Sequence, residues 1–294
     1  MLHSTPPTNE WLQTTFPAIG IGTSFNDTMT TENLPDIGIG TYDTDPDVCT
    51  ASVASALNIG YRHIDTAEMY ENEAAVGEAI TAADVDRGEV FVATKVHSRN
   101  LAHDDVLERA RASCDRLGVD GFDLLYVHWP IRAYDPEETL AAFDELHDRG
   151  LVQHVGLSNF TPELLDEARE ALEAPLFAHQ IECHPLLPQE ELRAYARKHD
   201  HYLVAYSPLA KGAVTEMPEL VDVADKHGVT AAQISLAWLL SKENVVVIPK
   251  STSETHIQEN YDAQRITLDD DDIARIDGID QTQRQVDFEG APWN

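Results

Sequence analysis

The chain has 294 residues, of which 43% are hydrophobic, so it can form the core of one large domain or of two ordinary ones. It contains 52 Asp and Glu against 20 Lys and Arg, a formal net charge of −32. A negative field of that size repels nucleic acid and anionic lipid, which excludes both as expected partners.

The acidic residues are scattered among periodic apolar segments, which indicates a folded protein with an acid-coated surface rather than a disordered chain. Such a surface suits a salt-rich cytoplasm, because salt screens the repulsion, and it predicts a halophilic protein. The three widely spaced cysteines, Cys49, Cys114 and Cys183, are typical of free thiols in a reducing compartment. No basic-then-apolar leader and no apolar run near the ~20 residues of a membrane helix is found, so a cytoplasmic protein without membrane contact is expected.

Residues 1–33 are rich in Thr and Pro and show no helical period, and they are interpreted as an N-terminal extension. Residues 16–23 are nearly repeated as residues 34–41. Two copies are too few for a repeat protein. The repeated segment is interpreted either as an N-terminal hairpin or as a relic extension.

From residue 34 onward, strand-like apolar runs alternate with helical patterns. In chain order, the expected strands are 37–41, 61–64, 90–96, 122–129, 152–157, 177–182, 202–206 and 245–248. The expected helices are 48–58, 73–81, one with its apolar stripe over 106–117, 136–148, one beginning near Thr161, 189–198, 218–227, 230–242, one beginning near Ser253, and 269–279. Four aspartates open the last helix and complement the positive end of its dipole.

Eight successive strand–helix units predict parallel strands joined by right-handed crossovers. Eight units in about 250 residues fit a single-domain (β/α)8 TIM barrel, an α/β fold, over residues 34–294. A doubly wound open sheet is the alternative, but Gly38 and Gly40 after the first strand lack the third glycine of a dinucleotide-binding fingerprint.

Polar side chains stand where several of these strands end. Asp65 closes the second strand and Tyr70 follows it, while Lys95 and His128 end the third and fourth. Taken singly, an Asp–Lys pair is usually structural and a strand histidine usually belongs to the core. All strand ends of a barrel face one mouth, however, so the convergence of the four favours a proton-transfer site.

The motifs around these residues resemble those of the aldo-keto reductase superfamily, and more narrowly its short-loop, prokaryotic-type members. The matching blocks occur in the family's order at residues 60–70, 94–96, 128–130, 156–160, 180–185, 206–209 and 248–251. The resemblance spans residues 34–294 and implies the reduction of aldehydes or ketones to alcohols by hydride transfer.

The resemblance implies a catalytic tetrad of Asp65, Tyr70, Lys95 and His128. A free tyrosine has a pKa near 10 and is a slow proton donor at neutral pH. The Lys95 ammonium is expected to lower the pKa of Tyr70, and Asp65 to hold Lys95. A neutral His128 would orient the carbonyl oxygen beside the Tyr70 hydroxyl.

The resemblance also implies a nicotinamide cofactor bound without a Rossmann fold. Ser158, Asn159 and Gln180 would bind the carboxamide. Taken alone, Ser158 and Asn159 are also typical of a cap for the helix that begins near Thr161. The other implied contacts are Tyr206 on the nicotinamide ring, Ser207 and Leu209 near the pyrophosphate, Thr41, Tyr42 and Asp65 near the ribose, and Lys250, Ser251, Ser253, His256, Glu259 and Asn260 at the 2′-phosphate and adenine.

Two positions depart from the family's pattern. His179 precedes Gln180 where the family often has asparagine. His256 stands where the family has an arginine, and histidine is mostly neutral at pH 7 and lacks the forked donors of a guanidinium. NADPH is therefore expected as the cofactor, with NADH also accepted.

The substrate is expected to be a small carbonyl compound. Tyr42, Tyr70, His128, Trp129 and Trp293 are the expected pocket residues, and the connections after Pro130 and after Ile279 are short. Short loops favour small aldehydes, ketoaldehydes or sugar-derived ketones over steroids. Arg132 is the one candidate for a carboxylate contact, and as a loop arginine it is expected to be solvated. The chain is expected to act as a monomer.

Two other functions compete with this one. A cofactor-binding regulatory or redox-sensing subunit could use the same barrel, but the intact tetrad argues against it. A metal-dependent hydrolase would need ligands, and His179, Cys183 and His184 span a strand and a turn rather than one helix face. The acidic run 269–272 lacks the pattern of a calcium loop, so no metal is expected.

Overall fold

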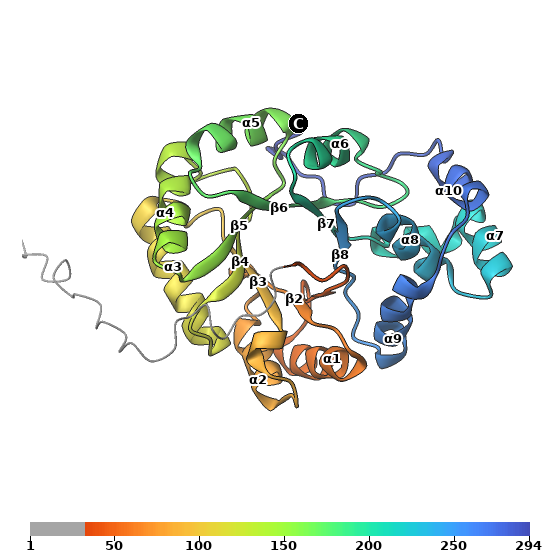
Figure 1. Ribbon diagram of the computed structural model, residues 1–294, viewed down its shortest axis with the longest axis horizontal. Helices are drawn as coiled ribbons and strands as arrows, with labels where there is room; N and C mark the ends of the chain where they lie inside the picture. Colours follow the sequence, from red (N-terminus) through yellow and green to blue (C-terminus); the bar gives the residue numbers. More distant parts are fainter. Residues whose placement is uncertain (1–32) are drawn as a thin grey trace, which may run out of the picture.

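The computed structural model describes residues 33–294, and within them eight parallel strands follow one another in chain order around a single sheet (Figure 1). The strands are β1 (Ile39–Gly40), β2 (His63–Asp65), β3 (Phe91–Val96), β4 (Phe122–Val127), β5 (Val152–Ser158), β6 (Leu176–Glu182), β7 (Tyr202–Tyr206) and β8 (Val245–Val247). A parallel bridge between Ile37 and Val247 joins the last strand to the segment that leads into the first. This ring confirms the (β/α)8 barrel and excludes the doubly wound sheet.

Helices follow the strands and surround the barrel (Figure 1). They are α1 (Pro46–Ile59), α2 (Glu73–Ala82), α3 (His103–Leu117), α4 (Pro136–Asp148), α5 (Pro162–Ala171), α6 (Glu190–Lys198), α7 (Pro218–His227), α8 (Ala231–Leu240), α9 (Glu254–Asp262) and α10 (Asp270–Asp277). Short 3-10 turns lie at η3 (Glu68–Tyr70), η4 (Arg87–Glu89), η5 (Ala210–Glu216) and η6 (Ala263–Arg265). Every expected helix and strand is present, with small differences at the ends.

Local sequence signals explain where the helices begin. Asp135 caps α4 by accepting hydrogen bonds from two backbone N–H groups, and Thr161 caps α5 in front of Pro162. Asp269 and Asp272 form a reciprocal capping box at the start of α10, so the aspartate run supplies specific hydrogen bonds as well as charge. Ser253, in contrast, makes no side-chain cap bond at α9.

The core has two layers. Side chains such as Phe91, Tyr126 and Val246 fill the barrel interior, and a larger apolar layer lies between the strands and the helices. Gly156 is required for the interior packing, because a Cβ atom there would lie 2.4 Å from the Tyr126 ring. The barrel is therefore a packed core, and ligands are confined to its mouth.

The expected extension at residues 1–33 lies almost wholly outside the described residues, as does the first copy of the near-repeat. The second copy contributes Leu34, which is buried in the barrel interior, and then Ile37 and β1.

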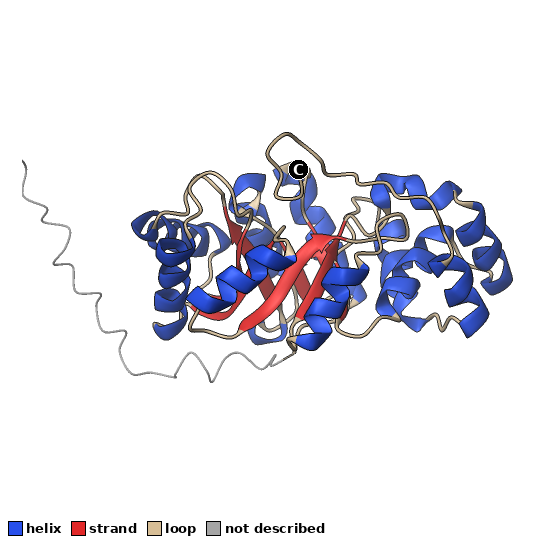
Figure 2. Cartoon of the chain, turned by 90° about the horizontal axis from the view of Figure 1, so that it is seen from above, coloured by secondary structure: helices blue, strands red, loops and turns tan. Residues whose placement is uncertain are grey.

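The chain beyond α10 returns across the carboxyl ends of the strands to the C terminus (Figure 2). The Gln283 N–H donates to the Leu186 carbonyl and fixes this return path to the segment after β6. None of the helices in the described part of the chain is long and apolar enough to cross a membrane.

Candidate active site

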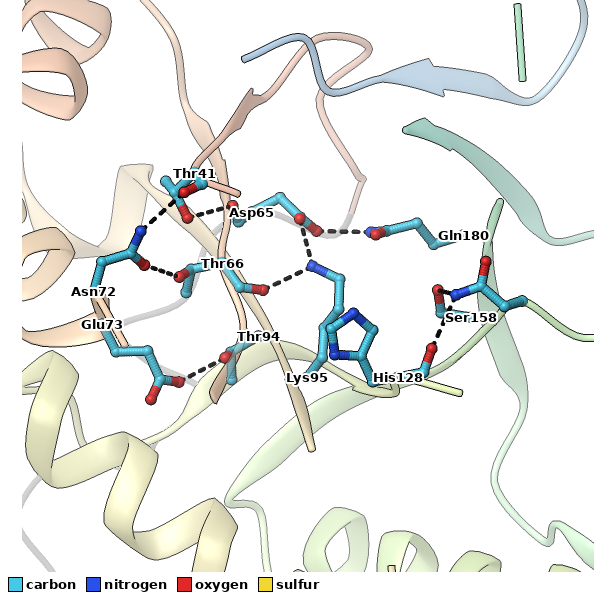
Figure 3. A network of polar contacts seen from close by, with 11 residues as sticks. Thr41, Asp65, Thr66, Asn72, Glu73, Thr94, Lys95, His128, Ser158 and Gln180 are labelled. Carbon is cyan, nitrogen blue, oxygen red and sulfur yellow. Dashed lines mark hydrogen bonds and ion pairs between the residues drawn. The ribbon is translucent and has the colours of Figure 1, made fainter. Parts of the chain in front are cut away.

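The four residues of the predicted tetrad lie together at the mouth of the barrel. Figure 3 shows three of them, Asp65, Lys95 and His128. The Lys95 Nζ atom lies 2.5 Å from Asp65 Oδ1 and 2.7 Å from the Thr66 carbonyl oxygen. It also lies 5.1 Å from the centroid of the Tyr70 ring, and the Tyr70 and His128 rings are 5.8 Å apart. Asp65, Lys95 and His128 are buried, while Tyr70 is only partly covered.

The charge of Lys95 is balanced inside the site. Burial lowers the pKa of its ammonium, and the contact with Asp65 opposes that effect. The Asp65 carboxylate and the Thr66 carbonyl together offset the cost of burying the ammonium. Asp65 therefore holds Lys95 in place, as expected.

Tyr70 corrects one expectation. Burial raises the pKa of its hydroxyl well above the usual value, and Asp65, Tyr206 and Tyr42 raise it further. The net shift is therefore opposite to the lowering predicted from Lys95, and its largest cause is burial. Tyr70 consequently keeps its proton throughout the neutral pH range.

His128 is neutral. Burial lowers the pKa of its imidazole well below the usual value, and Lys95 lowers it further. The His128 Nδ1 atom is buried and has no hydrogen-bond partner among residues 33–294. A neutral imidazole can orient a substrate oxygen without adding a second positive charge next to Lys95.

Two side chains that the sequence analysis missed hold the loop that carries Tyr70. The Glu68 carboxylate accepts hydrogen bonds from the His97 N–H and from Asn100 Nδ2, so η3 is tied to the loop after β3. Asn72 accepts from Thr66 Oγ1 and donates to the Thr41 carbonyl, which ties the other end of the loop to the segment after β1. Their only sequence signal is their position on either side of Tyr70.

The residues predicted to hold a carboxamide also converge. Gln180 Nε2 donates to Asp65 Oδ2 at 2.7 Å, which places Gln180 against the tetrad. Asn159 Nδ2 donates to the His128 carbonyl oxygen and to Ser158 Oγ, and Asn159 Oδ1 accepts from the Tyr206 hydroxyl at 2.8 Å. The site thus brings together the buried Ser158 hydroxyl, the buried amides of Asn159 and Gln180, and the Tyr206 ring. These groups fit a flat aromatic amide such as nicotinamide.

The remaining predicted cofactor residues lie in segments that follow β1, β7 and β8. Thr41 is buried and donates to the Asp65 carbonyl oxygen. Ser207 has a φ of 47°, a left-handed conformation that is uncommon outside glycine, and Leu209 precedes η5. Lys250, Ser251 and Ser253 lie in the loop after β8, and His256, Glu259 and Asn260 lie on α9. Lys250 and His256 are exposed, so both are accessible to a ligand.

The rim of the mouth is aromatic. Tyr42 is 59% exposed, and its ring lies 5.2 Å from that of Tyr70. Trp129 contacts Trp293 at 5.5 Å between ring centroids, as well as Phe288 at 5.0 Å. Phe288 was not predicted. Arg132 lies in the loop after β4 and is exposed, as expected.

Glu182 anchors the C-terminal tail to this rim and was also missed. Its buried carboxylate accepts hydrogen bonds from the Gln285 and Val286 N–H groups and from His184 Nε2. Burial by itself would raise the pKa of Glu182, but these hydrogen bonds outweigh it and hold the pKa below its ordinary value. The motif around residues 180–185 therefore also positions the chain segment that carries Phe288 and Trp293.

The three cysteines are free and buried. No group of three side chains able to hold a metal ion is found between residues 33 and 294. The three residues with metal-like spacing have other partners: His179 accepts from the Phe160 N–H, Cys183 donates to the Pro188 carbonyl, and His184 bonds Glu182.

Comparison with known proteins gives consistent matches over most of the chain. The Aldo/keto reductase family profile matches residues 36–281. An aldo-keto reductase of Mycobacterium sp. (strain JLS) is 38% identical over 257 residues, 86% of this chain and 91% of the relative. The methylglyoxal reductase DkgB of Escherichia coli O157:H7 is 37% identical over 260 residues, 87% of this chain and 97% of the relative. The solved structure of aldose reductase from Giardia lamblia superimposes with a TM-score of 0.83 at 29% identity, covering 87% of this chain and 95% of that one.

Proposed function

The chain belongs to the aldo/keto reductase family, and on that premise we propose that it reduces small aldehydes or ketones to alcohols with Tyr70 as the proton donor. The observation that carries the proposal is the cluster of Asp65, Lys95, Tyr70 and His128 at one barrel mouth. A regulatory subunit on the same barrel would have no need for a buried lysine beside a protonated tyrosine.

Each residue of the cluster has a distinct role in this proposal. Tyr70 carries the proton that the carbonyl oxygen receives, and its raised pKa keeps the hydroxyl protonated at neutral pH. The raised pKa also makes it a weaker acid, so the transfer depends on the positive charge of Lys95 beside the ring. The neutral His128 ring orients the same oxygen. Lys95, held by Asp65, places a positive charge 5.1 Å from the Tyr70 ring, where negative charge develops as the proton leaves.

The hydride would come from a nicotinamide cofactor. Ser158, Asn159 and Gln180 would fix its carboxamide, and Tyr206 would cover the ring. When bound, such a cofactor supplies a hydride from the ring carbon opposite its nitrogen. Thr41, Tyr42 and Asp65 would contact the ribose, and Ser207 and Leu209 the pyrophosphate.

NADPH is the proposed cofactor, with NADH also used. Lys250 offers a cation, and Ser251 and Ser253 offer hydroxyl groups to a 2′-phosphate. His256 is exposed on α9 near the same loop and replaces the charge-bearing arginine of the family. Glu259 and Asn260, both about one turn further along α9, complete the proposed adenine contacts.

The proposed substrates are small carbonyl compounds such as 2-ketoaldehydes. The similarity to a methylglyoxal reductase supports this class, and so does the rim formed by Tyr42, Trp129 and Trp293. We also propose that the protein is a short-loop, prokaryotic-type member of the family that acts as a cytoplasmic monomer. Its net charge of −32 supports a salt-rich cell as its setting.

A panel of carbonyl substrates tests the function. The purified protein in molar KCl is mixed with NADPH or NADH, and the loss of reduced-nicotinamide absorbance is followed with methylglyoxal, an aryl aldehyde and a sugar-derived ketone. Turnover with at least one substrate is expected. Cofactor binding without turnover on any of them would favour the regulatory subunit instead.

A further inference from the structure

His179 lies behind the proposed carboxamide site and outside it. Side chains alternate along a strand, so while Gln180 of β6 faces the mouth, its neighbour His179 faces the surrounding helices. The His179 ring is fully buried, and it lies 6.5 Å from the ring of His201, which precedes β7. His179 therefore cannot touch a cofactor at the mouth, and its contribution must act through another residue.

The backbone next to Asn159 shows what that contribution is. The last regular contact of β5 with β6 is the pair Ser158–Gln180, followed by a hydrogen bond from the Asn159 N–H to the Gln180 carbonyl at 3.0 Å. The chain then leaves the sheet, and the next N–H, that of Phe160, donates to His179 Nε2 at 3.2 Å. The His179 side chain thus accepts the hydrogen bond of the Phe160 N–H, at the point where the sheet no longer supplies a strand carbonyl as the acceptor.

The turn at this point is strained. Asn159 has a φ of 67°, in the left-handed region, and such conformations persist at functional sites only where the surroundings fix them. Its side chain is fixed by the His128 carbonyl and the Tyr206 hydroxyl, and its backbone by Gln180 on one side. His179 fixes the other side through Phe160.

We propose that His179 is a positioning residue for cofactor binding, which holds the strained Asn159 turn in its carboxamide-binding conformation through the Phe160 N–H. This inference rests on the proposed nicotinamide site. The acceptor role needs a neutral ring, and burial together with His201 lowers the pKa of His179 to about 3, so the acceptor is present at all pH values at which the enzyme would work. Without it, the buried Phe160 N–H would lose its partner and the turn would shift to find another.

Three variants separate positioning from simple packing. His179→Leu fills a similar space but cannot accept a hydrogen bond. His179→Gln places an oxygen near the Nε2 position and should restore the bond. His201→Leu is the matched control, because His201 is equally buried beside His179 yet neither of its ring nitrogens has a hydrogen-bond partner in the described part of the chain.

The NADPH dissociation constant is measured for each variant by quenching of tryptophan fluorescence, alongside kcat at saturating NADPH and the melting temperature. His179→Leu should weaken NADPH binding at least fivefold with kcat changed less than twofold. The NADPH dissociation constant of His179→Gln should be within twofold of that of the parent, and His201→Leu should bind NADPH like the parent.

The inference is overturned if His179→Leu binds NADPH as tightly as the parent, or if His201→Leu loses the same affinity. A parent protein that binds no NADPH would contradict the proposed function itself, a result distinct from either of these.

Discussion

Lys95 and Asp65 form a buried ion pair whose members depend on each other. Removing one partner of such a pair typically costs about 3–5 kcal/mol, because the other charge remains buried and uncompensated. The Asp65 carboxylate also adds to the effect of burial in raising the pKa of Tyr70. Substitutions of Asp65 or Lys95 therefore confound stability with catalysis, and residues outside the pair give cleaner tests.

His256 is such a residue. His256→Arg should shift the ratio of kcat/KM for NADPH over NADH toward NADPH by about tenfold, because a guanidinium offers a permanent charge and forked donors to a phosphate. The ratio is measured with one fixed aldehyde. Gln258→Arg, also exposed on α9, is the matched control for added charge. An unchanged ratio in His256→Arg would show that His256 does not lie at the 2′-phosphate.

The positions of the tetrad were predictable from sequence because polar residues ended apolar strands, and a barrel brings those ends together. The direction of the Tyr70 pKa shift was not predictable, since it depends first on how far the fold buries the hydroxyl. The roles of Glu68, Asn72 and His179 were missed for a related reason. Their hydrogen bonds join segments separated along the chain, and nothing in the local pattern indicates which partner each one finds.

At the scale of elements, the tail after α10 is held at the mouth by the hydrogen bond from Gln283 to Leu186 and by the Glu182 carboxylate. The Glu182 carboxylate accepts both the Gln285 and the Val286 N–H groups, while Phe288 and Trp293 pack on Trp129. Helices and strands were predicted from periodicity, but this aperiodic segment gave no comparable signal. Its path became apparent only from its contacts.

Replacing Glu182 should release this tail. Glu182→Gln retains one acceptor oxygen in place of a carboxylate, so amide hydrogen exchange at Gln285 and Val286 should be at least tenfold faster than in the parent, on the order of 1.4 kcal/mol of lost protection. Glu191→Gln, an exposed change on neighbouring α6, should leave both amides as protected as before. Equal protection in Glu182→Gln would rule out the anchor.

The same anchor sets a pH dependence. The folded-state pKa of Glu182 is lowered from 4.5, so its stabilising contribution is complete above pH about 4.5 and is lost as the pH falls through the lower folded value. In the parent protein, faster amide hydrogen exchange at Gln285 and Val286 should therefore begin only below pH about 4.5.

At the scale of the whole molecule, the net charge of −32 dominates. Carboxylates spread over one barrel repel one another, and the Debye length falls from about 10 Å at 0.1 M salt to about 3 Å at 1 M. The stability of the fold is therefore expected to depend on screening by salt, although local sequence signals specify each helix and strand.

The melting temperature should accordingly rise by about 10 °C or more between 0.1 M and 2 M KCl. Sucrose at matched osmolarity is the control, because it strengthens burial without screening charge. A melting temperature that is the same at both salt concentrations, or that rises equally in sucrose, would count against a charge-limited fold.

The most direct test of the central claim is the single substitution Tyr70→Phe, assayed for NADPH oxidation with the best substrate of the carbonyl panel and for NADPH binding by fluorescence. It removes the proposed proton and leaves the ring that lies between His128 and Tyr42. We expect kcat to fall by about a hundredfold or more while the NADPH dissociation constant stays within twofold of the parent. A Tyr70→Phe protein as active as the parent would contradict the assignment of Tyr70 as the general acid.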